Sequence, residues 1–285
     1  MKKLHFVRQW LLALSLSVIV ACGLAQAQPA QEQYQPQVGQ EGKDVVWVPT
    51  PQALVEKMLD MAKVTPKDYL IDLGSGDGRT VIAAAKRGLR ALGIEYNPEM
   101  VELSKGNAAK EGVSDKARFV KADLFESDFS DATVITMFLL PEINLRLRPI
   151  ILDLKPGTRI VSNSFTMGEW EADETATVNG GCASWCTALL WIVPAKVEGT
   201  WRLPQGELTL KQQFQMISGT LKSGNNSTQI KGRLRGDQIT FNGAGTQYTG
   251  RVSGNGIEGT VKSGGSSRKW SATRVSKAAA APSPS

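Results

Sequence analysis

The sequence predicts an α/β region, built on a doubly wound seven-stranded sheet, followed by a small antiparallel all-β meander or barrel. In the first region short apolar runs alternate with amphipathic helical stretches, which is typical of a doubly wound sheet. After Pro194 the helical periodicity stops, and short segments with alternating apolar residues follow, separated by Gly, Asn and Ser. The predicted boundaries are 46–195 for the α/β domain and 196–275 for the β domain.

The α/β region is expected to open with a helix that Thr50 caps and that has Pro51 as its first residue. Apolar runs then predict strands at 69–73, 91–95, 117–120, 133–138 and 159–162, with further candidates at 174–178 and 188–193. Helices are predicted between these strands at 80–86, 97–112 and 141–154. Because proline lacks the N–H that an inner helical turn needs, the last helix is expected to break at Pro149.

Residues 1–27 have the pattern of a secretory signal peptide. Three basic residues near the start precede an apolar run over 10–21, and Ala25-Gln26-Ala27 offers a cleavage point before Gln28. The predicted location is therefore exported: periplasmic or attached to the envelope. Ile19-Val20-Ala21-Cys22 also resembles a bacterial lipobox, so membrane attachment through Cys22 or through an uncleaved leader is the alternative.

Composition limits the chemistry that the chain can perform. The one histidine, His5, lies in the predicted leader, so removal of the leader would exclude Ser-His-Asp triads, Cys-His dyads and His-ligated zinc. No metal site is expected, and Cys182 and Cys186 are interpreted as a disulfide or as two buried thiols. The net charge of +6 comes partly from the leader, so nucleic acid is not expected as a partner.

Two polar segments are expected to be disordered. Residues 28–45 are rich in Gln and Pro and poor in apolar residues, which predicts a disordered linker. Residues 276–285 form a tail rich in Ala, Pro and Ser, which is also predicted to be disordered. Trp170, Trp185 and Trp191 are expected to pack in the core, with an aromatic pocket as the alternative.

Acidic and glycine residues follow three successive predicted strands. Asp72-Leu73-Gly74-Ser75-Gly76-Asp77-Gly78 joins a strand to a helix, where glycines let backbone N–H groups approach a ligand. Glu95 ends the next strand, where a carboxylate can hold both hydroxyls of a ribose. Asp123 and Leu124 follow the third strand, where an adenine can bind. Because parallel strands end at one edge of a sheet, these groups predict a nucleoside site.

This ordered set resembles motif I, the acidic position after it and motif II of the class I S-adenosylmethionine-dependent methyltransferases, over about residues 46–195. The resemblance implies a Rossmann-like sheet and S-adenosyl-L-methionine as cofactor. The predicted cofactor-binding residues are Asp72, Gly74, Ser75, Gly76, Gly78, Glu95, Asp123 and Leu124. Arg79 stands where the dinucleotide pattern G-x-G-x-x-G has its third glycine, which argues against a dinucleotide.

Val48-Pro49-Thr50-Pro51 and Phe138-Leu139-Leu140-Pro141 are similar to segments of small bacterial methyltransferases related to mitochondrial protein-lysine methyltransferases. This likeness implies a lysine amine as acceptor, although no substrate-reading residue can be transferred. The catalytic residue is left unknown. Glu142 is a candidate base for the acceptor amine, and the alternative is a carboxylate that only stabilises the first turn of a helix.

Two functions follow from these patterns. The first is a methyltransferase of the bacterial cell envelope that positions a protein or small-molecule acceptor, such as a lysine amine, in line with the sulfonium. The second is a non-catalytic envelope protein that retains a nucleoside-binding fold and binds a ligand or partner through its β domain. The complete glycine loop and the three acids favour the enzyme.

Overall fold

A computed structural model describes residues 34–243 and 245–277. The predicted leader at 1–27, with Cys22, lies outside the described residues, and so does most of the predicted tail at 276–285. Within the described part of the chain, no helix is long and apolar enough to cross a membrane.

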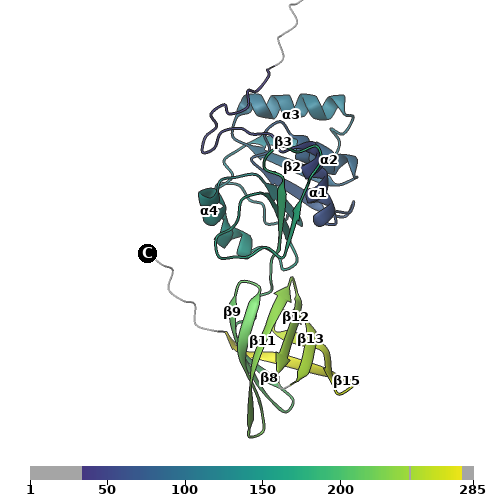
Figure 1. The fold of residues 1–285 in the computed structure, drawn as a ribbon, viewed down its shortest axis with the longest axis vertical. Helices are drawn as coiled ribbons and strands as arrows, with labels where there is room; N and C mark the ends of the chain where they lie inside the picture. The colour runs from purple at the N-terminus through teal and green to yellow at the C-terminus, as the bar shows by residue number, and fades with distance from the viewer. Residues whose placement is uncertain (1–33, 244, 278–285) are drawn as a thin grey trace, which may run out of the picture. The chain divides into compact units, whose positions relative to one another are not determined.

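One seven-stranded sheet forms the α/β region (Figure 1). Its strands are β1 (Tyr69–Leu73), β2 (Arg90–Glu95), β3 (Ala117–Lys121), β4 (Val134–Met137), β5 (Arg159–Asn163), β6 (Glu174–Thr177) and β7 (Thr187–Ile192). They lie in the order β3-β2-β1-β4-β5-β7-β6, and β7 runs antiparallel to both of its neighbours. The predicted seven-stranded Rossmann-like sheet is confirmed.

Two apolar cores cover the two faces of this sheet, which is why its central strands are apolar on both sides. The helices are α1 (Gln52–Met61), α2 (Arg79–Lys86), α3 (Pro98–Lys110) and α4 (Pro141–Leu152). Leu54 of α1 and Val81 of α2 belong to one core, which contains Leu70 of β1. Leu147 of α4 belongs to the other core, which contains Ile71, the next residue of β1. Successive residues of one strand therefore face opposite cores.

Two details of the helix predictions are wrong. Pro51 is the N-cap of α1, and the Thr50 hydroxyl instead accepts a hydrogen bond from the Asn163 side chain at 3.3 Å. Pro149 lies inside α4 and does not break it. Pro149 and Leu145, one turn earlier, are both exposed, so water can reach the Leu145 carbonyl that proline leaves without a donor.

The segment before α1 is ordered where the sequence predicts a disordered linker over 28–45, at least from residue 34 onward. The Gly39 N–H donates to the Trp47 carbonyl at 2.8 Å, and the Trp47 N–H donates to the Gln40 carbonyl at 2.9 Å. Trp47 packs its indole against Gly76 of the glycine loop. Few apolar residues suffice to order this segment because it packs them against the α/β domain. We call residues 40–50 the N-terminal strap.

The second region is a closed eight-stranded barrel, one of the two arrangements that the sequence predicts. Its strands are β8 (Gly199–Leu203), β9 (Gly206–Gln213), β10 (Met216–Ser223), β11 (Asn226–Arg235), β12 (Gln238–Gly243), β13 (Thr246–Ser253), β14 (Gly256–Ser263) and β15 (Ser266–Lys277). Alternate apolar side chains fill the interior, Trp201, Phe241 and Trp270 among them. The last strand includes Ser276 and Lys277, the first two residues of the tail that the sequence predicts to be disordered.

Contacts with the barrel occur where β6 begins. The Gln215 side chain donates to the Glu171 carbonyl at 2.8 Å, and Arg233 forms an ion pair with the buried carboxylate of Asp173. The register places the start of β6 beside the end of β7, and the end of β7 in turn lies beside the start of β5. The barrel therefore contacts the edge opposite to the one where the parallel strands end.

The loop between β6 and β7 contains a disulfide between Cys182 and Cys186, which decides between the two interpretations of these cysteines. Trp170 and Trp191 are fully buried, as expected for core residues. Trp185 is not, because it lies inside the disulfide-closed loop and is 45% exposed. The prediction of core packing is wrong for this tryptophan.

Candidate active site

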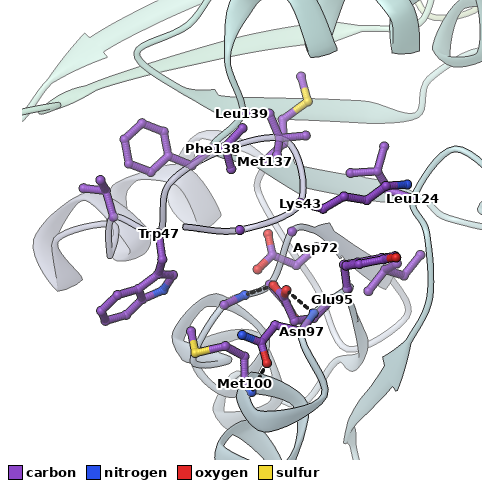
Figure 2. Close-up of a pocket in the computed structure, with 18 of the residues that line it drawn as sticks. Lys43, Trp47, Asp72, Glu95, Asn97, Met100, Leu124, Met137, Phe138 and Leu139 are labelled. Carbon is purple, nitrogen blue, oxygen red and sulfur yellow. Dashed lines mark hydrogen bonds between the residues drawn. The ribbon is translucent and has the colours of Figure 1, made fainter. Parts of the chain in front are cut away.

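A pocket opens at the carboxyl ends of β1, β2 and β4, under the N-terminal strap (Figure 2). Predicted cofactor-binding residues make up one side of its lining: Asp72, Gly74, Ser75, Gly76, Glu95, Asp123 and Leu124. The fold thus brings together groups that three separate strands carry.

Glycines shape the loop between β1 and α2. Gly78, the remaining predicted cofactor residue, lies outside the lining and begins α2 with a φ of +81°. A Cβ there would lie 2.7 Å from the Phe119 ring and 2.9 Å from Ser104. Gly76 has a φ of +53°, and a Cβ there would lie 2.7 Å from the Trp47 indole. Gly78 therefore serves the packing of the loop, whereas Gly76 faces the pocket.

Two backbone N–H groups fix the carboxylate of Glu95. Its Oε2 accepts from Gly76 and its Oε1 accepts from Asn97, each at 2.9 Å, as the dashed lines in Figure 2 show. The Asn97 side chain in turn caps α3 by accepting from Glu99 at 2.8 Å. Since a carboxylate oxygen has more than one acceptor site, both oxygens can still accept from the hydroxyls of a ligand.

Asp72 is buried at the end of β1, and its carboxylate accepts a 2.6 Å hydrogen bond from the Thr136 hydroxyl. Burial raises the pKa of Asp72 to about 7 against the effect of that hydrogen bond, and the charges of Glu95 and Asp77 also raise it. A cation bound in the pocket would favour the carboxylate, so Asp72 couples ligand charge to its own protonation.

Asp123 forms an ion pair with Lys43 of the strap, whose ammonium also lies 4.8 Å from the centroid of the Tyr96 ring. The hydrogen bond from Lys43 lowers the pKa of Asp123, and the Phe125 N–H, which donates at 2.9 Å, also lowers it. The carboxylate expected at the adenine is therefore held by the strap in this structure. In Figure 2 the strap passes over Asp72 and Glu95, with Lys43 and Trp47 extending from it.

Apolar residues complete the pocket on the side of β4 and α3. Met100, Met137, Phe138 and Leu139 all line it. Glu142, the predicted candidate for a catalytic base, is exposed in the first turn of α4 and lies outside this lining. Its position fits the alternative, a carboxylate that stabilises the start of the helix.

Comparison with known proteins identifies the family. Residues 72–174 match the family model described as the ANTKMT methyltransferase domain. A protein-lysine N-methyltransferase from Saccharolobus islandicus (strain REY15A) is 45% identical over 140 residues, which cover 48% of this chain and 87% of that protein. The chain belongs to the class I S-adenosylmethionine-dependent methyltransferases.

Other relatives of this methyltransferase match a similar share of the chain. The adenine nucleotide translocase lysine N-methyltransferase of Mus musculus is 35% identical over 119 residues, and the match covers 41% of this chain and 52% of that protein. The chain therefore spans about half the length of its mouse relative. A crystal structure titled RNA methyltransferase from Salinibacter ruber, in complex with S-adenosyl-L-homocysteine, is 46% identical with a TM-score of 0.49. The match covers 53% of this chain and 96% of the Salinibacter ruber chain.

The pocket of this methyltransferase fits S-adenosylmethionine. Ser75 lines the pocket, and its hydroxyl is buried without a hydrogen-bond partner among the described residues. Such a group costs free energy until a polar ligand atom reaches it. Glu95 can accept from the ribose, Asp123 lies where the adenine is expected, and Asp72 can face the cationic methionine end. Polar and charged groups of the right kind thus lie along one pocket.

The N-terminal strap and Asn97 belong to this site although the sequence pattern did not predict it. Lys43 lies 80 residues from Asp123 along the chain, and its polar surroundings are typical of disorder. The similarity of Val48-Pro49-Thr50-Pro51 to related enzymes was the one signal that the segment has a role. The sequence predicts a helix that starts at Asn97, which is correct but incomplete, because the Asn97 N–H also holds Glu95.

Proposed function

We propose that this methyltransferase transfers methyl groups to the ε-amine of a protein lysine. The similarity to the protein-lysine N-methyltransferase of S. islandicus, at 45% identity over 87% of that protein, is the observation that carries the proposal. The apolar wall of Met137, Phe138 and Leu139 supports it, since such a wall suits the alkyl chain of lysine and excludes water.

In this proposal the chain binds and positions both reactants. Glu95 holds the ribose, Asp123 the adenine and Ser75 a polar atom of the cofactor. When bound, S-adenosylmethionine supplies a methyl group on a sulfonium, so attack by the amine lone pair forms the N–C bond, breaks the C–S bond and leaves S-adenosylhomocysteine. The acceptor must lose one proton to solvent before it attacks, and the apolar wall favours its neutral form by desolvation.

We further propose that the enzyme works in the bacterial cell envelope. The predicted leader supports this location, and so does the disulfide between Cys182 and Cys186, because disulfides persist in oxidising compartments. The proposal requires S-adenosylmethionine in the same compartment. N-terminal sequencing and fractionation of the native protein test it: a start at Gln28 or a blocked Cys22 in the envelope supports export, and an intact Met1 in the cytoplasm contradicts it.

Labelling identifies the acceptor. The purified full chain is incubated with S-adenosyl-[methyl-³H]methionine and envelope proteins, and labelled peptides are analysed by mass spectrometry. Methylated lysine is expected, and a Glu95→Ala variant should lose the label while Glu99→Ala, which changes an exposed acid outside the pocket, should keep it. Label only in nuclease-sensitive material, or only on other side chains, would contradict the proposal.

A further inference from the structure

Three aromatic rings adjoin the cofactor pocket on the side of β4. The Phe138 ring, which lines the pocket, stacks on Phe165 with centroids 5.8 Å apart. Trp185 closes the group, with its centroid 6.1 Å from Phe138 and 5.1 Å from Phe165. Residues from three separate segments therefore form one aromatic surface that continues the wall of the pocket. We call these three residues the aromatic triad.

The aromatic triad leaves apolar surface open. Phe138 and Phe165 are half-buried, and Trp185 is 45% exposed, whereas Trp170 and Trp191 are fully buried. Single exposed apolar residues are common, but three rings in contact at the rim of a pocket form a surface that suits a ligand. The exposed face of Trp185 does not contribute to the core.

The backbone holds these rings in unusual conformations. Trp185 has a φ of +57°, and Ser164, directly before Phe165, has a φ of +60°. L-residues avoid this region because the Cβ crowds the backbone, and such conformations cluster at functional sites. The disulfide closes the five-residue loop that contains Trp185, and the Ser164 N–H donates to the Thr187 carbonyl at 2.7 Å. The fold thus enforces the positions of the rings.

Side chains on neighbouring elements support Phe165 in the same way. Its carbonyl accepts from the Ser162 hydroxyl at 2.8 Å and from the Asn144 side chain at 3.3 Å. Asn144 also donates to the Thr166 carbonyl at 3.1 Å and is fully buried in α4. The buried Asn144 amide therefore fixes the backbone of the turn that carries the Phe165 ring.

We propose that the aromatic triad is the acceptor site, which receives the alkyl chain of the substrate lysine and directs its amine to the cofactor pocket, with Trp185 held in place by the disulfide. This rests on lysine as the proposed acceptor. Aromatic faces match the four methylenes of lysine, and they attract ammonium groups, methylated ones included. The same site would accept the partly methylated product for a further round.

A binding experiment tests the site without relying on activity. Butyltrimethylammonium, which mimics a methylated lysine side chain, is titrated into the full chain saturated with S-adenosylhomocysteine and labelled with ¹⁵N-tryptophan. The indole signal of Trp185, assigned with Trp185→Phe, is expected to shift most and to saturate. Shifts confined to other tryptophans, or no shift at all, would overturn the proposal.

Kinetics test the role of Trp185 on the acceptor that labelling identifies. Trp185→Ala is expected to raise the KM for the acceptor about tenfold, the loss of about one exposed cation–π contact with its packing, and to leave the affinity for S-adenosylhomocysteine unchanged. Trp185→Phe should recover most of the loss. Met216→Ala, which removes an exposed apolar side chain from the barrel, is the control.

Failure of the proposed function and failure of the aromatic acceptor site give different results. Wild-type protein that methylates no lysine contradicts the proposed function, whereas lysine methylation with an unchanged KM in Trp185→Ala contradicts the aromatic acceptor site alone. A Cys182→Ser/Cys186→Ser double variant should raise the acceptor KM in the same direction, with the circular dichroism spectrum of the wild type. An unchanged KM in that folded variant would remove the disulfide from the proposal.

Discussion

Thr136 and Asp72 lie directly opposite each other on β4 and β1, and the threonine hydroxyl donates a 2.6 Å hydrogen bond to the carboxylate. This pair places a titratable group inside the sheet at the floor of the cofactor pocket. Because burial raises the pKa of Asp72 to about 7, its charge changes near neutral pH. Two predictions follow from this single group.

Cofactor affinity should depend on pH through Asp72. The positive charge of S-adenosylmethionine favours the carboxylate, so binding below about pH 7 must release the proton, and affinity should rise with pH by up to tenfold per unit and then level off. Calorimetric titrations between about pH 5.5 and 8 measure this slope. In Asp72→Asn the slope should disappear, and an equal slope in the variant would assign it to another group.

Folding stability should respond to the same group. An aspartate in the unfolded chain has a pKa of about 3.9, so in the window from about pH 4 to 7 the folded state binds more protons than the unfolded state. The contribution of Asp72 is present at low pH, is lost as pH rises through 7, and then stays constant. In urea unfolding, the free energy of unfolding of Asp72→Asn relative to the wild type should increase by about 2–3 kcal/mol between pH 5 and pH 8. The same difference between variant and wild type at both pH values would contradict the raised pKa of Asp72.

Glu95 should be the strongest single contributor to cofactor binding. Glu95→Gln places an amide N–H₂ against one of the N–H donors of Gly76 and Asn97, so it disturbs the loop and removes an acceptor for the ribose. We expect affinity for S-adenosylhomocysteine to fall about 10- to 100-fold, as for the loss of one or two charged hydrogen bonds. Glu99→Gln, on an exposed residue outside the pocket, should bind as the wild type does.

Lys43 should compete with the adenine for Asp123. Lys43→Met frees the carboxylate from its ion pair, so affinity for S-adenosylhomocysteine should rise a few-fold. Added salt should bring the wild type toward the variant, because exposed ion pairs are screened. Lys105→Met removes an exposed ion pair with Glu102 outside the pocket and serves as the control. Weaker binding in Lys43→Met would mean that Lys43 contacts the cofactor itself.

Gly78 should tolerate no side chain. Gly78→Ala combines a φ of +81° with a Cβ 2.7 Å from the Phe119 ring, so we expect a loss of about 2 kcal/mol or more in unfolding free energy. Gly106→Ala is the matched control, since it lies inside α3 with open space around its Cβ and should gain about 0.5–1 kcal/mol. Similar effects of the two changes, measured by urea unfolding, would contradict the packing described for the glycine loop.

The sheet was predictable because its central strands are buried on both faces. Tyr69–Leu73 reads as one apolar run that ends in glycines, and the pattern places its end correctly. The three acids of the site were predictable for the same reason, since strand order alone brings their positions to one edge. Gly78 shows the limit of this reasoning, because a motif position can serve packing rather than contact with the ligand.

The remaining differences come from tertiary contacts that local pattern does not encode. The strap is polar enough to suggest disorder, yet Trp47 and Lys43 tie it to residues 29 and 80 positions further along the chain. Hydrophobicity placed Trp185 in the core, whereas a loop closed by a disulfide turns it outward. Pro149 does not break its helix because the carbonyl that it leaves without a donor, that of Leu145, lies on the exposed side of α4.

Calorimetric titration of S-adenosylhomocysteine into the purified full chain is the most direct test that the pocket at the ends of β1 and β2 is a working cofactor site. We expect one saturable binding event per chain, strongly weakened by Glu95→Ala and by Asp123→Ala in protein with the circular dichroism spectrum of the wild type. Absence of binding heat from folded wild-type protein with both S-adenosylhomocysteine and S-adenosylmethionine, or wild-type affinity in both variants, would contradict it.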